Sequence, residues 1–363
     1  MKFRCERDVL TDALTAASRA ANPKAQLRVL SGLRLDLRGN QLVVTGSDLE
    51  LTISRTLEVA GSEDGTAVLP AKLVTEIVRH LEPGAVEVET TAERSLVSSG
   101  RSEFSLLPIP PDEFPNPPDL DGERVTVAAA EFAEGLRQVV GAASTDESRK
   151  VLTGVLLAAE TDGLRMVATD SYRLSFREFP GSSVLQAGQR VNVPSRALAE
   201  LTRSLDPDAD LEITLAETMV SFSFGGFVLS SWLIRDEFPD YAKLIPNDMP
   251  NELTIDRQVF LDAIRRVRLM ARNNSPIRLE MQDQLVRLSA QNPEDGEATE
   301  EVDAKFVGTE LTVAFNPEYL IDGLEVIPGE EVVLQTRDPQ KPAVIRPTDS
   351  EDLLYLLMPV RVS

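Results

Sequence analysis

The chain has 363 residues, and 37 lysines and arginines stand against 59 aspartates and glutamates, which gives a formal net charge of −22. The length predicts two or three domains, and 42 % hydrophobic residues exclude a disordered chain. A single cysteine excludes an internal disulfide framework, and a single histidine excludes zinc sites that need two. No apolar run approaches the ~18 residues of a membrane span, and no signal peptide opens the chain. We therefore expect a soluble cytoplasmic protein.

The first third of the chain alternates between strand and helix patterns. Residues 3–17 open with a short alternating stretch and continue with apolar residues at helical spacing. Residues 33–37 and 41–45 alternate as two strands joined by a turn. A second helix is predicted over Ala71–Leu81, and Pro83 then marks a turn before a further strand.

The same order returns twice along the chain. Residues 125–140 and 253–269 repeat the alternating start and the helical stripe. The leucines that lead one strand, Leu42, Leu164 and Leu285, are about 120 residues apart, and so are the turn prolines at 83, 207 and 328. The sequence therefore predicts three repeats, each made of two similar halves.

Proline-rich polar connectors separate the repeats. They cover residues 108–122 and 239–251, and the first is too rich in proline for a helix or a central strand. We expect the first to be an extended, ordered connector. The predicted domains are residues 1–121, 122–248 and 249–363.

This pattern predicts an α+β fold of six small units. Each half has a strand, a helix and three strands, a βαβββ-like order, with helices on one side of antiparallel sheets. One half is too small to bury its own core, so halves must pair. A row of such domains ends in unpaired sheet edges, and two chains joined head to tail would close them into a ring.

Basic residues gather near the predicted helices although the chain is acidic. Residues 261–272 hold Arg265, Arg266, Arg268 and Arg272 against one acid, and the spacing of three of these arginines predicts a shared helix face. Such a basic wall would attract phosphates without reading base sequence. The alternative interpretation is a set of ordinary solvated helix faces.

Several ordered motifs make the whole chain, Met1 to Ser363, resemble the bacterial sliding clamp family, the beta subunits of DNA polymerase III. They include Thr45–Glu50, Ser99–Ser102, Val167–Asp170, Glu237–Tyr241 and Met358–Arg361. The resemblance implies three DNA-clamp domains and a head-to-tail homodimer that encircles duplex DNA. It implies no catalytic activity and no cofactor.

The resemblance also implies the partners. They are the polymerase III alpha subunit, other polymerases, the clamp loader and repair proteins, which bind through short linear peptides in a nucleoid-associated bacterial protein. The implied peptide pocket lies between repeats two and three, with an apolar trough and with Arg173 and Arg361 at its rim. Its residues are Leu152, Thr169, Tyr172, Arg173, Leu174, Pro239, Lys243, Leu244, Pro342, Leu356, Leu357, Met358, Pro359, Val360 and Arg361.

Two further sets of residues follow from the same interpretation. Basic residues of the helices and neighbouring loops are expected to face DNA: Lys24, Lys72, Arg149, Lys150, Arg196, Arg203, Arg265, Arg268 and Arg272. The dimer contact is expected to pair apolar residues and to set Arg101 against an acidic loop of the partner chain: Arg101, Phe104, Leu269, Met270, Glu297, Glu300 and Glu301.

Other classes of function remain as alternatives. An enzyme would need His80 beside a Ser–Asp pair such as Ser47–Asp48, which lies far from it in sequence. A carboxylate metal site at Asp48 and Glu50 competes with ordinary turn capping. The remaining alternative is a monomeric acidic peptide-binding scaffold that does not encircle DNA.

Overall fold

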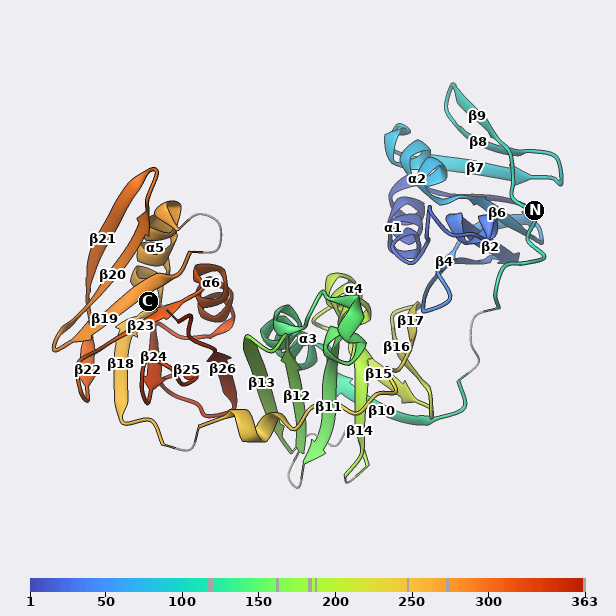
Figure 1. Cartoon of the computed structure of the whole chain (residues 1–363). Helices are drawn as coiled ribbons and strands as arrows, with labels where there is room; N and C mark the ends of the chain where they lie inside the picture. Colours follow the sequence, from blue (N-terminus) through green and yellow to red (C-terminus); the bar gives the residue numbers. More distant parts are fainter. Residues whose placement is uncertain are drawn as a thin grey trace. The chain divides into compact units, whose positions relative to one another are not determined.

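The computed structural model describes residues 1–116, 120–160, 163–181, 185–186, 188–246, 248–271 and 275–361 (Figure 1). Within these ranges the order strand, helix and three strands occurs six times, and two short extra strands interrupt it. The predicted α+β class and the βαβββ halves are confirmed.

The first repeat carries two of these units. The first unit is β1 (Lys2–Glu6), α1 (Arg7–Ser18), β2 (Gly32–Arg38), β3 (Gln41–Ser47) and β4 (Leu51–Glu58). After the extra strand β5 (Ala60–Glu63), the second is β6 (Gly65–Pro70), α2 (Ala71–His80), β7 (Ala85–Thr90), β8 (Ser95–Ser99) and β9 (Ser102–Leu106).

The second repeat has the same order. Its first unit is β10 (Glu123–Ala128), α3 (Ala129–Val139), β11 (Gly154–Glu160), β12 (Gly163–Thr169) and β13 (Arg173–Pro180). Its second unit is β14 (Arg190–Pro194), α4 (Ser195–Ser204), β15 (Asp210–Leu215), β16 (Met219–Phe224) and β17 (Phe227–Trp232).

The third repeat ends the chain. Its first unit is β18 (Asn251–Asp256), α5 (Arg257–Val267), β19 (Ile277–Gln282), β20 (Leu285–Asn292) and β21 (Gly296–Asp303), followed by the extra strand β22 (Lys305–Val307). Its second unit is β23 (Leu311–Phe315), α6 (Pro317–Val326), β24 (Glu331–Thr336), β25 (Ala343–Pro347) and β26 (Leu353–Leu357).

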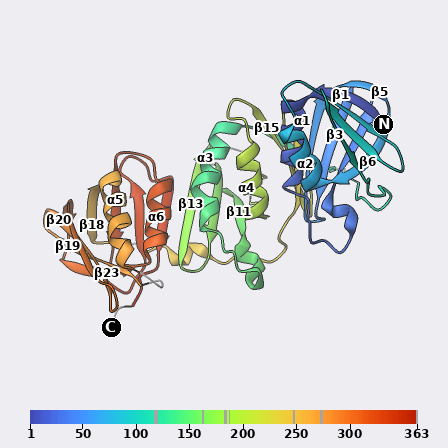
Figure 2. The same cartoon turned by 90° about the horizontal axis from the view of Figure 1, so that it is seen from above.

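The helices form where the sequence provides an apolar stripe, and α5 and α6 also begin at a side-chain cap. In α1 the stripe buries Leu10, Ala13, Leu14 and Ala17. The Asp256 carboxylate caps α5 by accepting from the Val259 amide at 2.8 Å, and Pro317 opens α6 at its first turn. Helices α1 and α2 pack together, as do α5 and α6, which lie side by side in both views (Figures 1 and 2).

Antiparallel ladders join neighbouring repeats into shared sheets. Strand β4 of repeat one pairs with β17 of repeat two inside an eight-stranded sheet. Strand β13 of repeat two pairs with β26 of repeat three inside a nine-stranded sheet. The outer sheets have five strands, ending at β9, and four strands, ending at β21.

These shared sheets divide the chain into two compact units. One contains residues 1–133 and 196–233, and the other contains residues 134–195 and 234–363. Each unit therefore holds one outer repeat and part of the middle one, because the ladders cross the repeat borders. The predicted domain boundaries stay a prediction.

The described parts of both connectors are anchored by buried side chains. Phe114 and Ile109 pack with Val68 in a small cluster, and the Ile109 amide donates to the Val68 carbonyl at 2.8 Å. Phe238 and Tyr241 pack against one face of the nine-stranded sheet. The described parts of the connectors are thus anchored by hydrophobic residues, and the second contains a 3-10 turn at Tyr241–Leu244.

Candidate functional site

A tight turn between β12 and β13 fixes the first part of the predicted pocket. The Asp170 carboxylate accepts from the backbone amides of Tyr172 at 2.8 Å and Arg173 at 2.9 Å. The Thr169 hydroxyl accepts from the amide of Ser171 at 3.1 Å, and Ser171 is left-handed with φ 83°. Short polar side chains thus stabilise a turn that leaves Tyr172 exposed.

The C-terminal strand brings the second part of the pocket to this turn. Strand β26 pairs with β13, with Leu357 opposite Arg173. Just beyond the ladder, the Met358 amide donates to the Tyr172 carbonyl at 2.8 Å. Tyr172 is 58 % exposed and Met358 is 38 % exposed, so two large side chains about 180 residues apart in sequence present adjoining surface.

Burial divides the predicted pocket residues into two groups. The first is buried: Leu152, Thr169, Leu174, Leu356 and Leu357. Leu174 and Leu356 belong to the apolar cluster under Phe238 and Tyr241. The second group is exposed or half-buried and provides the accessible surface: Tyr172, Pro239, Lys243, Leu244, Pro342, Met358, Pro359, Val360 and Arg361. The buried leucines belong to the core, and the predicted trough between the two groups stays a prediction.

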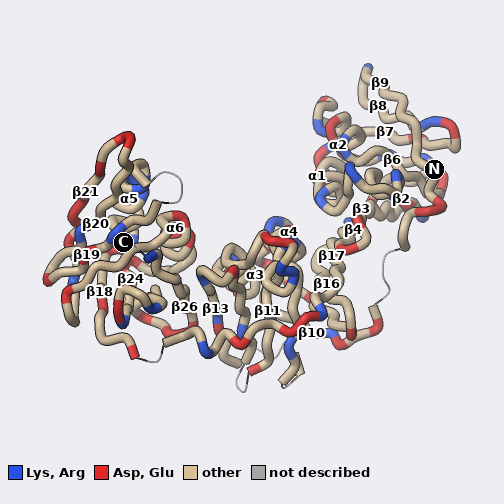
Figure 3. The backbone as a smooth tube through the Cα atoms, in the orientation of Figure 1, with Lys and Arg blue, Asp and Glu red and all other residues tan. Residues whose placement is uncertain are grey.

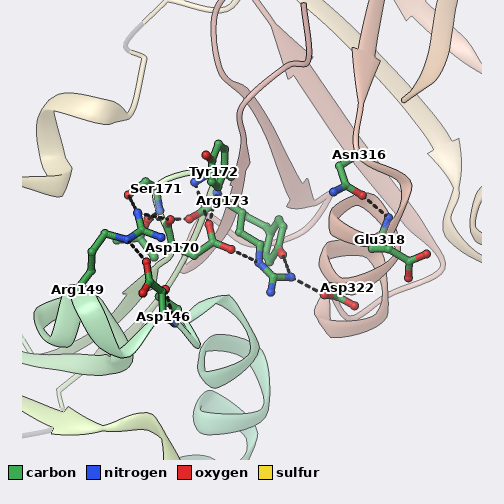
Figure 4. A network of polar contacts seen from close by, with 12 residues as sticks. Asp146, Arg149, Asp170, Ser171, Tyr172, Arg173, Asn316, Glu318 and Asp322 are labelled. Atoms are coloured by element: carbon green, nitrogen blue, oxygen red, sulfur yellow. Dashed lines mark hydrogen bonds and ion pairs between the residues drawn. The ribbon is translucent and has the colours of Figure 1, made fainter. Parts of the chain in front are cut away.

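Arg173 is held inside a polar network and does not form a rim (Figure 4). Its side chain is 12 % exposed, its Nε lies 3.0 Å from the Asp170 carboxylate, and its Nη1 is bonded to Asp322 on α6. The same Nη1 donates to the Tyr355 hydroxyl at 3.3 Å, and the guanidinium lies 4.6 Å from the centre of the Tyr319 ring. Two carboxylates of this chain already neutralise Arg173, so a partner would have to compete with them for its charge, and the expected role of Arg173 stays a prediction.

The network shifts the ionisation of its members. Burial lowers the pKa of the Arg173 guanidinium, but Tyr355, Asp322 and Asp170 outweigh it and the net shift is upward. Burial raises the pKa of the Tyr355 phenol, and the nearby Arg173 opposes this only in part. At physiological pH the arginine is protonated and the tyrosine neutral, as both would be in water, and the upward shifts extend these states to higher pH.

The exposed ring of Tyr172 has an aromatic neighbour, the half-buried Tyr319. The rings of Tyr172 and Tyr319 stack with centres 6.5 Å apart and planes inclined by 24°. Arg149 reaches the same turn, since its Nη1 donates to the Ser171 hydroxyl at 3.2 Å while its Nε donates to Asp146 at 2.9 Å. Figure 4 shows Arg149 reaching the turn from another element, while the Arg173 side chain extends from the turn toward Asp322.

Most of the arginines expected to face DNA are already in ion pairs. Arg196 is bonded to Asp48, and Arg203 lies 2.6 Å from Glu200. Arg265 lies 2.7 Å from Glu325, and Arg268 lies 2.9 Å from Glu318. Around α4 and α5, basic and acidic segments alternate in Figure 3. A count of charges along residues 261–272 missed Glu318 and Glu325, because both lie on α6.

The remaining predicted DNA-facing residues differ in their surroundings. Lys24 and Lys72 are exposed, and no carboxylate within the described ranges pairs with either. Lys150 lies 4.0 Å from Glu147. Arg272 falls outside the described residues. Helix α5 ends at Val267 and a 3-10 turn covers Arg268–Met270, so the expected continuous arginine face stops at that turn.

The predicted dimer residues lie at two sheet edges. Arg101 and Phe104 are exposed beside and on β9, and Leu269 is exposed while Met270 is half-buried after α5. The three acids lie on the edge strand β21, but each already has a partner in this chain. Glu300 contacts Arg266 at 2.5 Å, Glu301 contacts Arg287 at 2.7 Å, and Glu297 accepts from Gln291 at 3.3 Å.

The enzyme and metal alternatives find no support in the described residues. His80 is exposed, and its ring nitrogen lies 2.8 Å from the Glu76 carbonyl of its own helix. Asp48 caps the β3–β4 turn and bonds Arg196, which is the capping role that competed with a metal site. No cluster of three potential metal ligands occurs in the ranges described above. Nor does any helix there combine the length and apolar character needed to cross a membrane.

The network residues that sequence reasoning missed are Asp170, Tyr319, Asp322 and Tyr355. Asp170 follows Thr169 in a turn motif, which is a usable local signal. Asp322 and Tyr319 lie on α6, nearly 150 residues from Arg173, and only the β13–β26 ladder brings them together. No local pattern in the sequence marks that contact.

Three family models match the chain in succession. They describe the DNA polymerase III beta subunit: its N-terminal domain at residues 1–118, its central domain at 126–240 and its C-terminal domain at 242–361. The beta sliding clamp of Staphylococcus aureus is 33 % identical over 99 % of both chains, and that of Staphylococcus epidermidis is 32 % identical over 99 % of both.

Solved structures agree over the whole length. A sliding clamp from Bartonella birtlesii, bound to griselimycin, has a TM-score of 0.95 and 29 % identity, and all of each chain is covered. A DNA polymerase sliding clamp from Bacillus subtilis has a TM-score of 0.93 and 29 % identity, again with all of each chain covered.

Proposed function

Because this chain belongs to the DNA polymerase III beta-subunit family and is a DNA sliding clamp, we propose that two copies close head to tail into a ring around duplex DNA. A beta subunit is a non-catalytic processivity subunit of the polymerase. The ring would let the polymerase stay on its template while moving along it. We place this activity in the bacterial cytoplasm, at the nucleoid.

Two unpaired sheet edges carry the proposal of a ring. Strand β9 ends the five-stranded sheet and β21 ends the four-stranded one, so each offers free backbone donors and acceptors. Pairing β9 of one copy with β21 of the other would satisfy both edges. Exposed Phe104 and Leu269, with half-buried Met270, would add apolar contact.

Backbone pairing and apolar burial should dominate this contact. The acids on β21 already bind Arg266 and Arg287, so Arg101 would have to compete for them. Exposed ion pairs contribute only about 0–1 kcal/mol each. A charge change at Arg101 should therefore weaken the ring less than a polar substitution at Phe104.

DNA would be held by phosphate contacts that do not depend on base sequence. Lys24 and Lys72 supply charge with no competing carboxylate among the described residues. Arg149, Lys150, Arg196, Arg203, Arg265 and Arg268 would exchange their present partners for phosphates, and Arg272 is part of the same proposal. Loose contacts of this kind suit a protein that must slide.

Partner proteins would bind through short peptides at the exposed residues Tyr172, Leu244 and Met358, of which Tyr172 and Met358 adjoin. Methionine adapts its shape to different side chains, which suits a site that several partners share. Griselimycin-bound relatives support a ligand site on clamps of this family. The proposed partners are the polymerase III alpha subunit, other polymerases, the clamp loader and repair proteins.

The test is DNA synthesis on a primed circular template by a bacterial polymerase III core with its clamp loader. The native chain should lengthen the products, while Met358→Ala combined with Leu244→Ala and, separately, Phe104→Asp should both lose that effect. Val307→Ala, which removes an exposed apolar side chain elsewhere, should behave like the native chain. Short products with the native chain, or unchanged products with both variants, would contradict the proposal.

A further inference from the structure

Repeats one and two meet where β17 pairs with β4, beside the β3–β4 turn. We call this the first joint. It is built like the second joint, where β26 pairs with β13 beside the β12–β13 turn and where the proposed peptide site lies. In the β3–β4 turn, the Asp48 carboxylate accepts from the amides of Glu50 at 3.1 Å and Leu51 at 2.8 Å, as Asp170 does for Tyr172 and Arg173. The Ser47 hydroxyl accepts from the Leu49 amide at 3.2 Å, which is the role of Thr169 in the other turn.

The strand that meets this turn also matches. Strand β17 pairs with β4, with Ser231 opposite Leu51, as β26 pairs with β13. The Trp232 amide then donates to the Glu50 carbonyl at 3.2 Å, as the Met358 amide donates to the Tyr172 carbonyl at 2.8 Å. Trp232 therefore occupies the place that Met358 has at the other joint.

The side chains at this joint are large, apolar and exposed. Leu49 is 52 % exposed and Trp232 is 45 % exposed, and the indole N–H donates to the Leu49 carbonyl at 3.0 Å. Leu49 has a φ of 80°, a left-handed conformation that costs a branched residue energy. A glycine or asparagine at this position would relieve that cost, and burial would remove the leucine side chain from water. Position 49 is nevertheless an exposed leucine, so its presence needs another explanation.

We propose that Leu49 and Trp232 form a second peptide-docking surface, the Leu49–Trp232 patch, which binds an extended apolar segment of a partner protein. In an extended segment, alternate side chains point the same way, so two apolar residues two positions apart would cover the leucine and the indole together. The class of ligand rests on the proposed function, since the equivalent joint is the proposed peptide site. A partner with two such segments would gain avidity by binding both joints.

The polar side of the patch is already organised. The Arg196 guanidinium bonds the Asp48 carboxylate, and its Nη2 donates to the Arg19 carbonyl at 3.4 Å. At the other joint the corresponding aspartate is bonded by Arg173 from its own turn. Both aspartates thus keep the turn rigid, and a bound segment would not have to order it.

Trp232 is the only tryptophan of the chain, so its fluorescence reports this patch directly. The probe is the end-blocked peptide Ser-Leu-Ser-Phe-Ser, and the control peptide carries serine in place of its leucine and phenylalanine. We expect a saturable change in Trp232 emission with the probe alone. Leu49→Asp should weaken that binding at least tenfold, while Leu174→Ala combined with Met358→Ala should leave it unchanged.

A second variant separates binding from folding. Leu49→Gly removes the side chain and relieves the left-handed conformation, so it should raise the melting temperature and still lose the emission change. No saturable change in the native chain, or equal affinity in the native chain and both Leu49 variants, would overturn the proposal. An emission change that appears on raising protein concentration alone, and is not altered by the probe peptide, would overturn it in favour of self-association.

Calorimetric measurement of griselimycin binding distinguishes a wrong proposal for the site at Met358 from a wrong proposal for the Leu49–Trp232 patch. If Leu174→Ala with Met358→Ala abolishes griselimycin binding but leaves the emission change, both proposals stand. If griselimycin binding is unaffected while the emission change persists, the proposed site at Met358 is wrong and the Leu49–Trp232 patch stands. If griselimycin binding is abolished and the native chain shows no emission change, the patch alone is wrong.

Discussion

At the scale of single residues, Arg173 holds repeats two and three together. It belongs to β13, whereas Asp322 and Tyr319 belong to α6 and Tyr355 to β26. A buried charge without its partners is costly, so removing one side of such a pair is expensive. The exposed surface of Tyr172 and Met358 thus lies on a rigid base.

Replacing Arg173 should therefore lower stability. Arg173→Met leaves Asp170 in a nearly buried site without its cation, and we expect the free energy of unfolding to fall by about 3 kcal/mol. Urea unfolding measures it. Arg337→Met is the matched control, because Arg337 is exposed and lies 3.9 Å from the exposed carboxylate of Asp248, and it should change stability by less than about 0.5 kcal/mol. Equal effects of the two substitutions would contradict this role.

The raised pKa of Tyr355 has a consequence above pH 10. The phenol of the unfolded chain ionises near its ordinary value of 10.0, but burial keeps the folded phenol protonated to higher pH. The contribution of Tyr355 to stability is therefore complete below pH 10 and is lost as pH rises beyond it. Tyr355→Phe cannot ionise, so its free energy of unfolding should fall less steeply above pH 10 than that of the native chain. If urea unfolding gave free energies that fall equally steeply above pH 10 in Tyr355→Phe and in the native chain, the raised pKa of Tyr355 would be refuted.

At the scale of elements, periodicity predicted most of what the structure contains. Apolar stripes located the helices, and alternation with turn residues located the central strands, because both patterns are set by local burial. The short edge strands β5 and β22 escaped prediction, since four and three residues carry too little alternation. The end of α5 was also missed, because Arg268–Met270 keep a helical pattern while the backbone tightens into a 3-10 turn.

The candidate sites were harder to predict than the elements. The resemblance supplied the positions of Tyr172 and Met358, but their burial and their partners depend on ladders between distant strands. The partners of the arginines are long-range as well: Glu318 and Glu325 lie on α6, far in sequence from α5. Local charge counts therefore overestimated the free positive charge near α5.

Charge reversal on α5 tests whether those arginines reach DNA. Arg265→Glu combined with Arg268→Glu should weaken binding to duplex DNA and make it less dependent on salt, by about 0.9 in the logarithmic slope for each phosphate that the variant no longer neutralises. Fluorescence anisotropy at several salt concentrations measures this. Arg287→Glu on β20 also breaks ion pairs but lies outside the proposed set, and it should leave the slope unchanged. Equal slopes in all three proteins would exclude α5 from the DNA-facing surface.

At the scale of the whole molecule, the chain is strongly acidic and yet is a DNA sliding clamp. A net charge of −22 opposes general adhesion to DNA, so encirclement rather than tight binding is the physical way to stay on the duplex. That argument needs a closed ring, which we propose forms from two copies joined at β9 and β21. A monomeric peptide-binding scaffold would have the same exposed Tyr172 and Met358 but would have no use for these edges.

The most direct test is the molar mass in solution, measured by light scattering over a dilution series. We predict twice the 39.8 kDa of one chain, persisting on dilution, and a single-chain mass for Phe104→Asp with an unchanged circular dichroism spectrum. Arg101→Ala should stay closer to the native chain than Phe104→Asp. A mass of 39.8 kDa for the native chain at every concentration would contradict the ring.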